Sequence, residues 1–377
     1  MDLSFSPDEL AFAAEVRAWL AEHLEEPPEF ADLDEEIAWG RRWQARLAED
    51  RWVGIHWPAR YGGRDATPVQ VALYHMEYAR AGAPQPVNRV GINLAGPTLL
   101  AHGTEDQRRR WLPGILDASE LWCQLFSEPD AGSDLAALRT RADPVPGGFR
   151  VTGQKVWTSY AQYARWGIAL VRTDPDLPRH RGLSYLVIDM AAPGIEIRPL
   201  RQITGEAEFN EVFLHEVFVP DDHLVGGPGE GWAVANTTLA HERGTAFPFK
   251  EQVLHETHLE ALLRLARERN RLDDPDVADG LARAFLLLRL LRLQNWRTLS
   301  RLARGGEPGP ESSVTKLIWT EMTQHLSASA LDVLGPQACL AGRWPRQWLW
   351  SHAASIAGGT SEIQRTIIGE RILGLPR

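Results

Sequence analysis

Three short segments of this chain hold the residue types that could carry out chemistry. Residues 127–134 are rich in turn formers, including Pro129 and Gly132, so this segment can present backbone N–H groups and serine hydroxyls to a polar ligand. Residues 358–361 precede a terminal helical pattern, where free N–H groups and the helix dipole favour an anion. Glu242 lies on a predicted helix, and its carboxylate could act as a general base.

The elements that would position these segments begin with helices. Ser6, Pro7 and Glu9 have the order expected of a capping box with proline in the first turn. Apolar residues then recur at helical spacing through residues 10–24. Further helices are expected over 34–49, 68–80 and 97–102.

A β-rich region follows from about Leu121. Runs of β-branched and aromatic residues, separated by turn residues, predict strands over 167–172, 183–189, 195–199 and 211–220. No helix-sized segment alternates with them, which argues against a parallel α/β sheet. A small barrel or sandwich is therefore expected.

The remainder of the chain is predicted to be helical. Amphipathic segments are expected over 233–243, 250–269, 275–304, 312–334 and 361–373, and four of them can pack as an antiparallel bundle. Ser361 with Gln364 should form the capping box of the last helix. The fold class is thus α+β multidomain: an N-terminal helical domain over 1–120, a middle β-barrel or sandwich over 121–230, and a C-terminal four-helix bundle over 231–377.

Composition excludes several classes of protein. The 377 residues carry a net charge of -10, which argues against a nucleic-acid binder but not against an anionic ligand held by local arginines. The most apolar stretch, 285–293, contains Arg289 and Arg292, so no membrane span is expected. The N-terminus lacks the pattern of a signal peptide, and two cysteines cannot form a disulfide framework or a thiolate metal site. The cytoplasm is the expected location.

Two further patterns are predicted to be structural. The glycine-rich loop at 226–231 lacks the spacing of a dinucleotide-binding fingerprint and is expected to be an interdomain connector. His255 and His258 lie three residues apart, whereas a zincin helix needs a spacing of four. They are expected to lie on a solvated helix face.

Two long motifs identify a family. The first reads Trp-Cys-Gln-Leu-Phe-Ser-Glu-Pro-Asp-Ala-Gly-Ser-Asp over 122–134, followed by Gly-Gln-Lys-Val-Trp-Thr-Ser over 153–159. The second reads Ala-Gly-Gly-Thr-Ser-Glu-Ile-Gln-Arg over 357–365. Together with Trp-Pro at 57–58, Tyr-Gly-Gly at 61–63 and His-Gly-Thr-Glu at 102–105, they resemble the acyl-CoA dehydrogenase family over essentially the whole chain.

The resemblance implies an FAD enzyme. Trp157 would lie against the flavin ring system and the Ser159 hydroxyl would approach N5, while Thr360 and Glu362 match positions near the FAD diphosphate. The family usually has threonine where Ser127 and Ser159 stand, and serine keeps the hydroxyl. The full set of implied cofactor-binding residues is Gln124, Phe126, Ser127, Gly132, Ser133, Trp157, Thr158, Ser159, Thr360 and Glu362.

The catalytic base is displaced from its commonest place. In many members it lies two residues before the threonine of the C-terminal motif, which here is Gly358. Glu242 resembles the alternative base of the isovaleryl-type and long-chain members, on the first helix after the β domain. It would take the α-proton of an acyl-CoA while flavin N5 takes the β-hydride. The resemblance also places Ser133, Arg243 and the Gly358 N–H at the substrate, the last as an enolate-stabilising donor.

The implied partners are an electron-transfer flavoprotein and further subunits. The family completes each FAD site with a neighbour's Arg-x-x-Phe-Gly loop and a glutamine before Gly-Gly. Here 269–273 reads Arg-Asn-Arg-Leu-Asp and 332–336 reads Asp-Val-Leu-Gly-Pro, so both patterns are degraded. A heterotetramer with a paralogous chain and a homo-oligomer both stay open. So do two other functions, a non-catalytic subunit and a flavin oxidase or monooxygenase. The acyl group also stays open: linear, branched, ring-bearing or dicarboxylic.

Overall fold

The computed structural model describes residues 5–242, 246–306 and 309–376, which form two compact units. The helical unit comprises residues 5–26, 66–83 and the described residues from 246 onward. The mixed unit comprises Pro27–Asp65 and Pro84–Glu242. Each unit has its own buried core.

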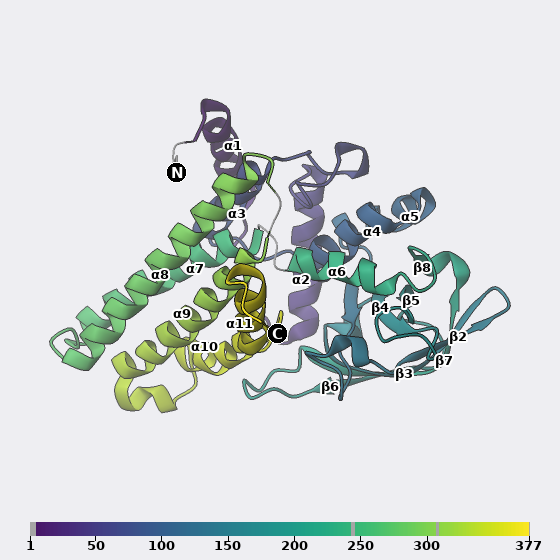
Figure 1. Cartoon of the computed structure of the whole chain (residues 1–377). Coiled ribbons are helices and arrows are strands. Elements are labelled where there is room, and N and C mark those ends of the chain that lie inside the picture. The colour runs from purple at the N-terminus through teal and green to yellow at the C-terminus, as the bar shows by residue number, and fades with distance from the viewer. Residues whose placement is uncertain (1–4, 243–245, 307–308, 377) are drawn as a thin grey trace. The chain divides into compact units, whose positions relative to one another are not determined.

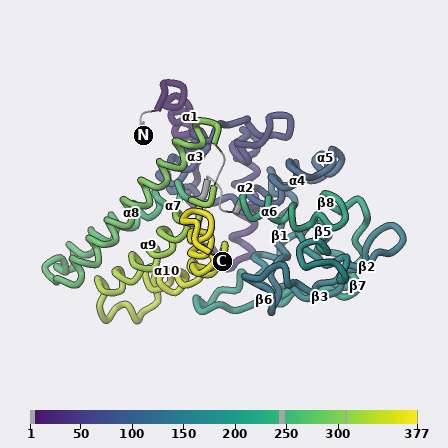
Figure 2. Tube along the Cα trace, in the orientation of Figure 1, coloured from purple at the N-terminus to yellow at the C-terminus, as the bar shows by residue number. Residues whose placement is uncertain are grey.

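The helical unit combines helices from both ends of the chain. Helices α7, α8 and α9 lie side by side (Figure 1), and α3 packs on α7 while α1 packs on α3. The trace in Figure 2 shows the N-terminal α1 and α3 beside these later helices. The bounds are α1 Pro7–His23, α3 Pro68–Arg80, α7 Ala246–Glu268, α8 Pro275–Leu302, α9 Glu311–Leu334, α10 Arg343–Ser351 and α11 Ser361–Ile367.

The mixed unit holds one sheet with helices packed around it. The strand order is β6-β7-β3-β2-β4-β5-β8, with β1 paired to β4. The pairing is antiparallel except for β1 with β4 and a single residue pair between β2 and β4. The strands are β1 Trp122–Leu125, β2 Arg141–Val145, β3 Gly148–Ser159, β4 Trp166–Arg172, β5 Leu183–Asp189, β6 Ile195–Leu200, β7 Phe209–Pro220 and β8 Leu224–Val225; the helices are α2 Leu33–Glu49, α4 Gly96–His102, α5 Glu105–Leu116 and α6 Gly231–Glu242.

The predicted order of helical, β and helical regions is confirmed. The expected strand over 183–189 matches β5, whereas β1, β2, β3 and β8 were not foreseen. The twelve-residue β3 was not predicted because Gly153, Gln154 and Lys155 interrupt its apolar pattern. Cross-strand packing against β7 nevertheless holds it in the sheet. The domain boundaries at 120 and 230 stay a prediction.

Helix caps give one confirmation and one correction. Ser6 caps α1 with a full capping box, as expected. The predicted cap Ser361 is wrong, because the N-cap of α11 is Thr360, whose hydroxyl accepts a hydrogen bond from the Ile363 N–H at 3.2 Å. Thr360 has the extended backbone of a cap residue (φ -60°, ψ 159°), which makes Ser361 the first helical residue.

No helix among the described residues is long and apolar enough to cross a bilayer. Those residues also contain no group of three histidine, cysteine or acidic side chains placed to hold a metal ion. Cys123 is buried, Cys339 is exposed, and both are free thiols.

Candidate active site

Trp157 is held outward by a distortion of β3. The register between β3 and β7 shifts between Lys155 and Thr158, so Trp157 lies in a bulge. Its φ is +60°, in the left-handed region that non-glycine residues rarely adopt. Its side chain is 62% exposed and touches Phe209 edge-on. A large aromatic side chain kept at the surface at a cost in backbone strain indicates a binding function.

The turn after β1 lies directly against this part of β3. The Ser127 carbonyl accepts a hydrogen bond from the Val156 N–H at 3.0 Å, which brings Ser127 next to Trp157. The Ser127 side chain is half-buried, and its hydroxyl forms no hydrogen bond with the described residues. Phe126 is buried against Tyr185 with ring centroids 5.9 Å apart, and Gln124 is half-buried on β1. The structure therefore brings together Ser127 and Trp157, as the motif predicted.

The rest of the loop turns from buried to exposed residues. Glu128 and Ala131 exchange two backbone hydrogen bonds and close a tight turn. Gly132 and Ser133 follow at the surface, and a Cβ on Gly132 would meet no protein atom within 4 Å. Packing inside this chain thus does not require glycine at 132, and the space beside it is open to a ligand.

The two residues after Trp157 lie in different surroundings. Ser159 is half-buried and its hydroxyl has no partner among the described residues. Thr158 is 1% exposed, and its Oγ1 is buried without a hydrogen-bond partner. Only Ser159 is therefore open to a ligand through its side chain, whereas Thr158 could contribute through its backbone.

A buried ion pair lies behind the turn, and its role was not foreseen from the sequence. The Lys155 ammonium contacts the Glu128 carboxylate at 2.9 Å, with 0% and 8% of the two side chains exposed. Burial lowers the pKa of Lys155, against the opposing effect of Glu128. Burial alone would raise the pKa of Glu128, but Lys155 and hydrogen bonds at Thr140 and Arg139 lower it on balance.

Helix α6 is anchored by a cluster of buried hydroxyls. Thr238 Oγ1 lies 2.8 Å from Thr98 Oγ1 on α4 and 3.1 Å from the Tyr185 hydroxyl on β5. Thr237 Oγ1 lies 2.7 Å from His102 Nε2. Since Tyr185 also touches Phe126, one buried side chain joins the turn after β1 to α6. No local pattern indicates this cluster beyond the residue types.

Glu242 is the last residue of α6. Its side chain and the whole of Arg243, both predicted site residues, lie outside the described residues. In a helix, positions four apart share a face, so the backbone of Glu242 follows Thr238 on the anchored side of α6.

The C-terminal motif belongs to the helical unit. Gly358 and Gly359 have φ of +67° and +93°, so both need the conformational freedom of glycine. The buried Gln364 side chain donates to both of their carbonyls, at 3.1 and 3.2 Å. Glu362 is exposed at the start of α11, where its own N–H and the Thr360 hydroxyl lower its pKa.

Two buried side chains of α9 hold the segment before this motif. The Lys316 ammonium and the Thr320 hydroxyl both donate to the Ala354 carbonyl, at 2.7 and 3.0 Å. Nothing in the spacing of these residues predicted the contact, because it joins positions 38 and 34 residues apart.

The two degraded stretches meet each other in the helical unit. Arg269 donates to the Leu334 carbonyl at 3.4 Å and to Gln337 Oε1 at 2.6 Å. Arg271 donates to the Asp332 carbonyl at 3.3 Å. Both arginines are therefore engaged within their own chain.

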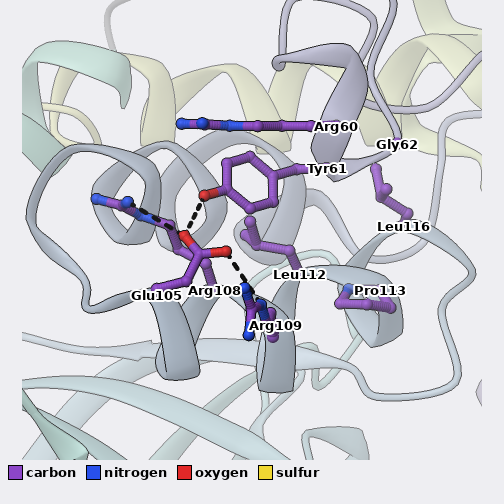
Figure 3. A pocket seen from close by; sticks show the side chains of 9 residues that line it. All are labelled: Arg60, Tyr61, Gly62, Glu105, Arg108, Arg109, Leu112, Pro113 and Leu116. Atoms are coloured by element: carbon purple, nitrogen blue, oxygen red, sulfur yellow. Dashed lines mark hydrogen bonds and ion pairs between the residues drawn. The ribbon is translucent and has the colours of Figure 1, made fainter.

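A surface hollow of about 520 Å³ lies between the turn at 60–62 and α5 (Figure 3). Two of the shorter family motifs meet here, since the Tyr61 hydroxyl donates to Glu105 at 2.6 Å and Arg109 donates to the same carboxylate at 3.1 Å. None of the predicted site residues lines the hollow. These motif residues therefore serve packing between the turn and α5.

The expected solvated histidine face on α7 is wrong. His255 is 6% exposed, with Nε2 3.0 Å from Thr323 Oγ1 and Nδ1 2.6 Å from the Glu251 carbonyl. This face of α7 packs on α9, so the histidine lies inside the bundle. His258 is half-buried, and burial, then His255 and Arg343, lower its pKa to about 4.

The observed groups fit a flavin. An isoalloxazine ring has an apolar face and an edge of hydrogen-bonding atoms. Trp157 offers a flat exposed surface, and the neighbouring Ser127 and Ser159 offer hydroxyls that the described residues leave unpaired. The features that the motif was expected to provide are therefore present in the mixed unit.

Comparison with known proteins gives the same family along the chain. Models of the acyl-CoA dehydrogenase N-terminal, middle and C-terminal domains match residues 6–119, 123–217 and 229–373. The acyl-CoA dehydrogenase IpdE1 of Mycobacterium tuberculosis is 42% identical, covering 97% of each chain. A solved structure named Tcur3481-Tcur3483 steroid ACAD has a TM-score of 0.84 at 29% identity, covering 100% of each chain. The ChsE4-ChsE5 complex from Mycobacterium tuberculosis has a TM-score of 0.81 at 31% identity and the same coverage.

Members of this family use FAD, and solved relatives include complexes of two different chains. Three consecutive domain matches and a relative that is 42% identical over nearly the full length agree with one another. The chain belongs to the acyl-CoA dehydrogenase family, a family of FAD-dependent oxidoreductases.

Proposed function

We propose that this protein removes the α and β hydrogens of an acyl-CoA thioester, with Glu242 as the base. Bound FAD would supply the hydride acceptor, through N5 of its ring. The observation that carries the proposal is the anchoring of α6. Tyr185 contacts both Phe126, in the turn expected to face the flavin, and Thr238, four residues before Glu242.

The choice of Glu242 rests on chemistry and on helix geometry. Gly358 has no group that can accept a proton, so the base must come from another position. Glu242 shares the face of α6 that Thr238 presents to Tyr185 and Thr98. The backbone of Glu242 therefore continues the side of α6 that carries Thr238.

The roles proposed for the other site residues follow from their hydrogen-bond donors and from the flat surface of Trp157. The Gly358 N–H would hold the thioester oxygen as negative charge develops on it, since glycine loses only the side chain. Trp157 would support the ring face, and Ser127 and Ser159 would donate to its polar edge. Arg243 and Ser133 would contact the CoA thioester.

We propose a bulky, ring-bearing acyl group as the substrate. The name of one solved relative describes a steroid enzyme. A glycine at 358, in place of a carboxylate, leaves room beside the reacting carbons for a wide substrate. Anaerobic titration with linear, branched, dicarboxylic and polycyclic acyl-CoAs would test this, and equal or faster flavin bleaching by linear chains would contradict it.

We propose that the chain works in a heteromer with a paralogous chain. The two stretches that would complete a neighbour's FAD site are occupied by contacts of Arg269 and Arg271 within the chain. Two solved relatives are named as pairs of chains. A partner chain would then supply the missing contacts to FAD.

Electrons are expected to leave through an electron-transfer flavoprotein in the cytoplasm. Free Cys123 and Cys339 suit a reducing compartment. Reoxidation of the reduced enzyme by electron-transfer flavoprotein, with slow reaction toward oxygen, would support this acceptor. Fast reoxidation by oxygen would instead favour an oxidase.

Substitution of the base tests the central proposal. Glu242→Gln should leave FAD bound but slow flavin reduction by substrate at least about a hundredfold, because general-base catalysis contributes about 10²–10⁴-fold. The measurement is anaerobic stopped-flow absorbance of the purified complex at saturating acyl-CoA.

A matched control is Glu211→Gln, which alters a carboxylate on β7 that pairs with Gln154. The flavin of this control variant should be reduced by substrate at the wild-type rate. An unchanged rate in Glu242→Gln would remove Glu242 from the mechanism. A wild-type complex that holds FAD but is reduced by no acyl-CoA would favour the non-catalytic alternative.

A further inference from the structure

We propose that Lys155 and Glu128 act as an internal clamp that positions the flavin-facing turn, so that their role is in FAD binding rather than in stability. The two side chains are buried behind the turn, with 0% and 8% of their surface exposed, which makes them positioning residues. The inference rests on the proposed function only in taking Ser127 and Trp157 as the flavin-facing groups.

The Lys155 ammonium is fully used inside the protein. It donates to the Phe126 carbonyl at 3.0 Å, to Glu128 Oε1 at 2.9 Å and to the Leu170 carbonyl at 2.8 Å. Three acceptors match the three N–H donors of a charged lysine. The ammonium thus ties both ends of the segment 126–128 to β4 of the sheet.

Glu128 ties the same turn to the start of β2. Its Oε2 accepts from the Arg139 N–H at 2.7 Å, and its Oε1 accepts from the Thr140 N–H at 2.9 Å as well as from Lys155. The carboxylate therefore bridges the two ends of the loop that carries Gly132 and Ser133. Its backbone also closes the turn with Ala131.

The clamp acts on both groups that would meet the flavin. Lys155 binds the Phe126 carbonyl and the following Val156 N–H binds the Ser127 carbonyl, so both carbonyls of the turn point toward β3. The Ser127 hydroxyl is then left for a ligand. Lys155 also stands at the start of the bulge that turns Trp157 outward. A shift of this side chain would move Ser127 and Trp157 together.

Stability does not explain the pair. Moving two charges from water into a buried site costs more than a well-packed apolar pair of the same size, and such replacements are often neutral or stabilising. A fully buried pair that bonds three carbonyl or amide groups of one loop is better explained by the conformation that it imposes. The effect of the pair on the unfolding temperature and its effect on FAD affinity can therefore be measured separately.

The experiment replaces the charges and keeps the shape. The double variant Glu128→Gln/Lys155→Met should unfold at a higher temperature than the single variant Glu128→Gln, because it leaves no unpaired buried charge. Its FAD dissociation constant should rise about 10–100-fold, as for residues that orient the ligands of a bound metal. The band shape of the bound flavin should change, and amide hydrogen exchange over 126–140 should speed up without FAD or substrate present.

A second variant keeps the test decisive if the double variant does not fold. Glu128→Asp retains the charge and shortens the side chain, so it should also weaken FAD binding and loosen 126–140. The control Asp189→Glu changes the Arg165–Asp189 ion pair, at 2.6 Å in the same sheet. It should leave both the FAD affinity and the amide exchange over 126–140 unchanged. Wild-type FAD affinity, flavin spectrum and exchange in a folded clamp variant would overturn the proposal. Because exchange is measured without substrate, that result is independent of whether Glu242 is the base.

Discussion

At the scale of single residues, the site is marked by side chains placed against their ordinary preferences. Trp157 is exposed at a left-handed φ, and Lys155 and Glu128 are buried although charged groups prefer water. Each placement costs free energy that the surrounding contacts must offset. Their concentration around one turn is the physical sign of a binding site.

The pH dependence of stability should reveal the state of Glu128. Its pKa is lowered in the folded protein, so its contribution is present above the unfolded value of about 4.3 and is lost as pH falls through the lower folded value. Glu128→Gln should therefore destabilise the protein by about 3–5 kcal/mol at neutral pH, since it leaves Lys155 without a counter-charge. Urea unfolding of both proteins from pH 7 downward should show this gap narrowing below about pH 4. A difference in unfolding free energy between the two proteins that does not change with pH would contradict the lowered pKa of Glu128.

At the scale of elements, the site depends on how α6 is held against the sheet. A helix can rotate or slide on an apolar surface at small cost, but hydrogen bonds between buried hydroxyls define its position. Thr238 bonds to both Thr98 on α4 and Tyr185 on β5. These two contacts fix the rotation of α6 about its axis at Thr238.

Removing the central hydroxyl tests this role of the cluster. Thr238→Val keeps the shape but leaves the buried Thr98 and Tyr185 hydroxyls short of a partner, which should cost about 1–3 kcal/mol of unfolding free energy. Flavin reduction should also slow, because α6 is no longer held in one rotation. Denaturant unfolding and stopped-flow reduction measure the two effects.

The neighbouring Thr237→Val serves as the comparison. Thr237 is only half-buried and bonds to His102, so its loss should affect stability and rate less than the loss of Thr238. Equal effects of the two substitutions would show that Thr238 has no special part in orienting α6.

At the scale of the whole molecule, the chain assembles its helical unit from both ends. Helices α1 and α3 pack with α7, so residues far apart in sequence share one core. The C-terminal motif lies in this unit, whereas the turn at Ser127 and Trp157 lies in the mixed unit.

Cofactor content should show whether the chain is sufficient alone. With Arg269 and Arg271 engaged internally, the chain purified alone should hold less than one FAD per subunit and should gain FAD when assembled with its paralogous partner. Native mass spectrometry combined with flavin absorbance measures the ratio. A homo-oligomer with one FAD in every subunit would contradict the heteromeric proposal.

Family, element order and most of the candidate groups could be predicted from the sequence. Helical spacing, turn residues and the two long motifs are local properties, and they identified β5, the cap of α1 and the turn at Ser127. Errors occurred where local rules compete with packing. Thr360 caps α11 in place of Ser361, and His255 is buried because its helix face meets α9.

Motif spacing and residue type were enough to name residues that could bind a flavin, and the family resemblance named Glu242 as the possible base, because both are local patterns along the chain. The tertiary structure alone showed that Lys155 and Glu128 are buried together behind the turn, and that Thr98, Thr238 and Tyr185 join α6 to the sheet. Such contacts connect positions up to 140 residues apart. Their partners are chosen by the packing of whole elements, which local pattern does not specify.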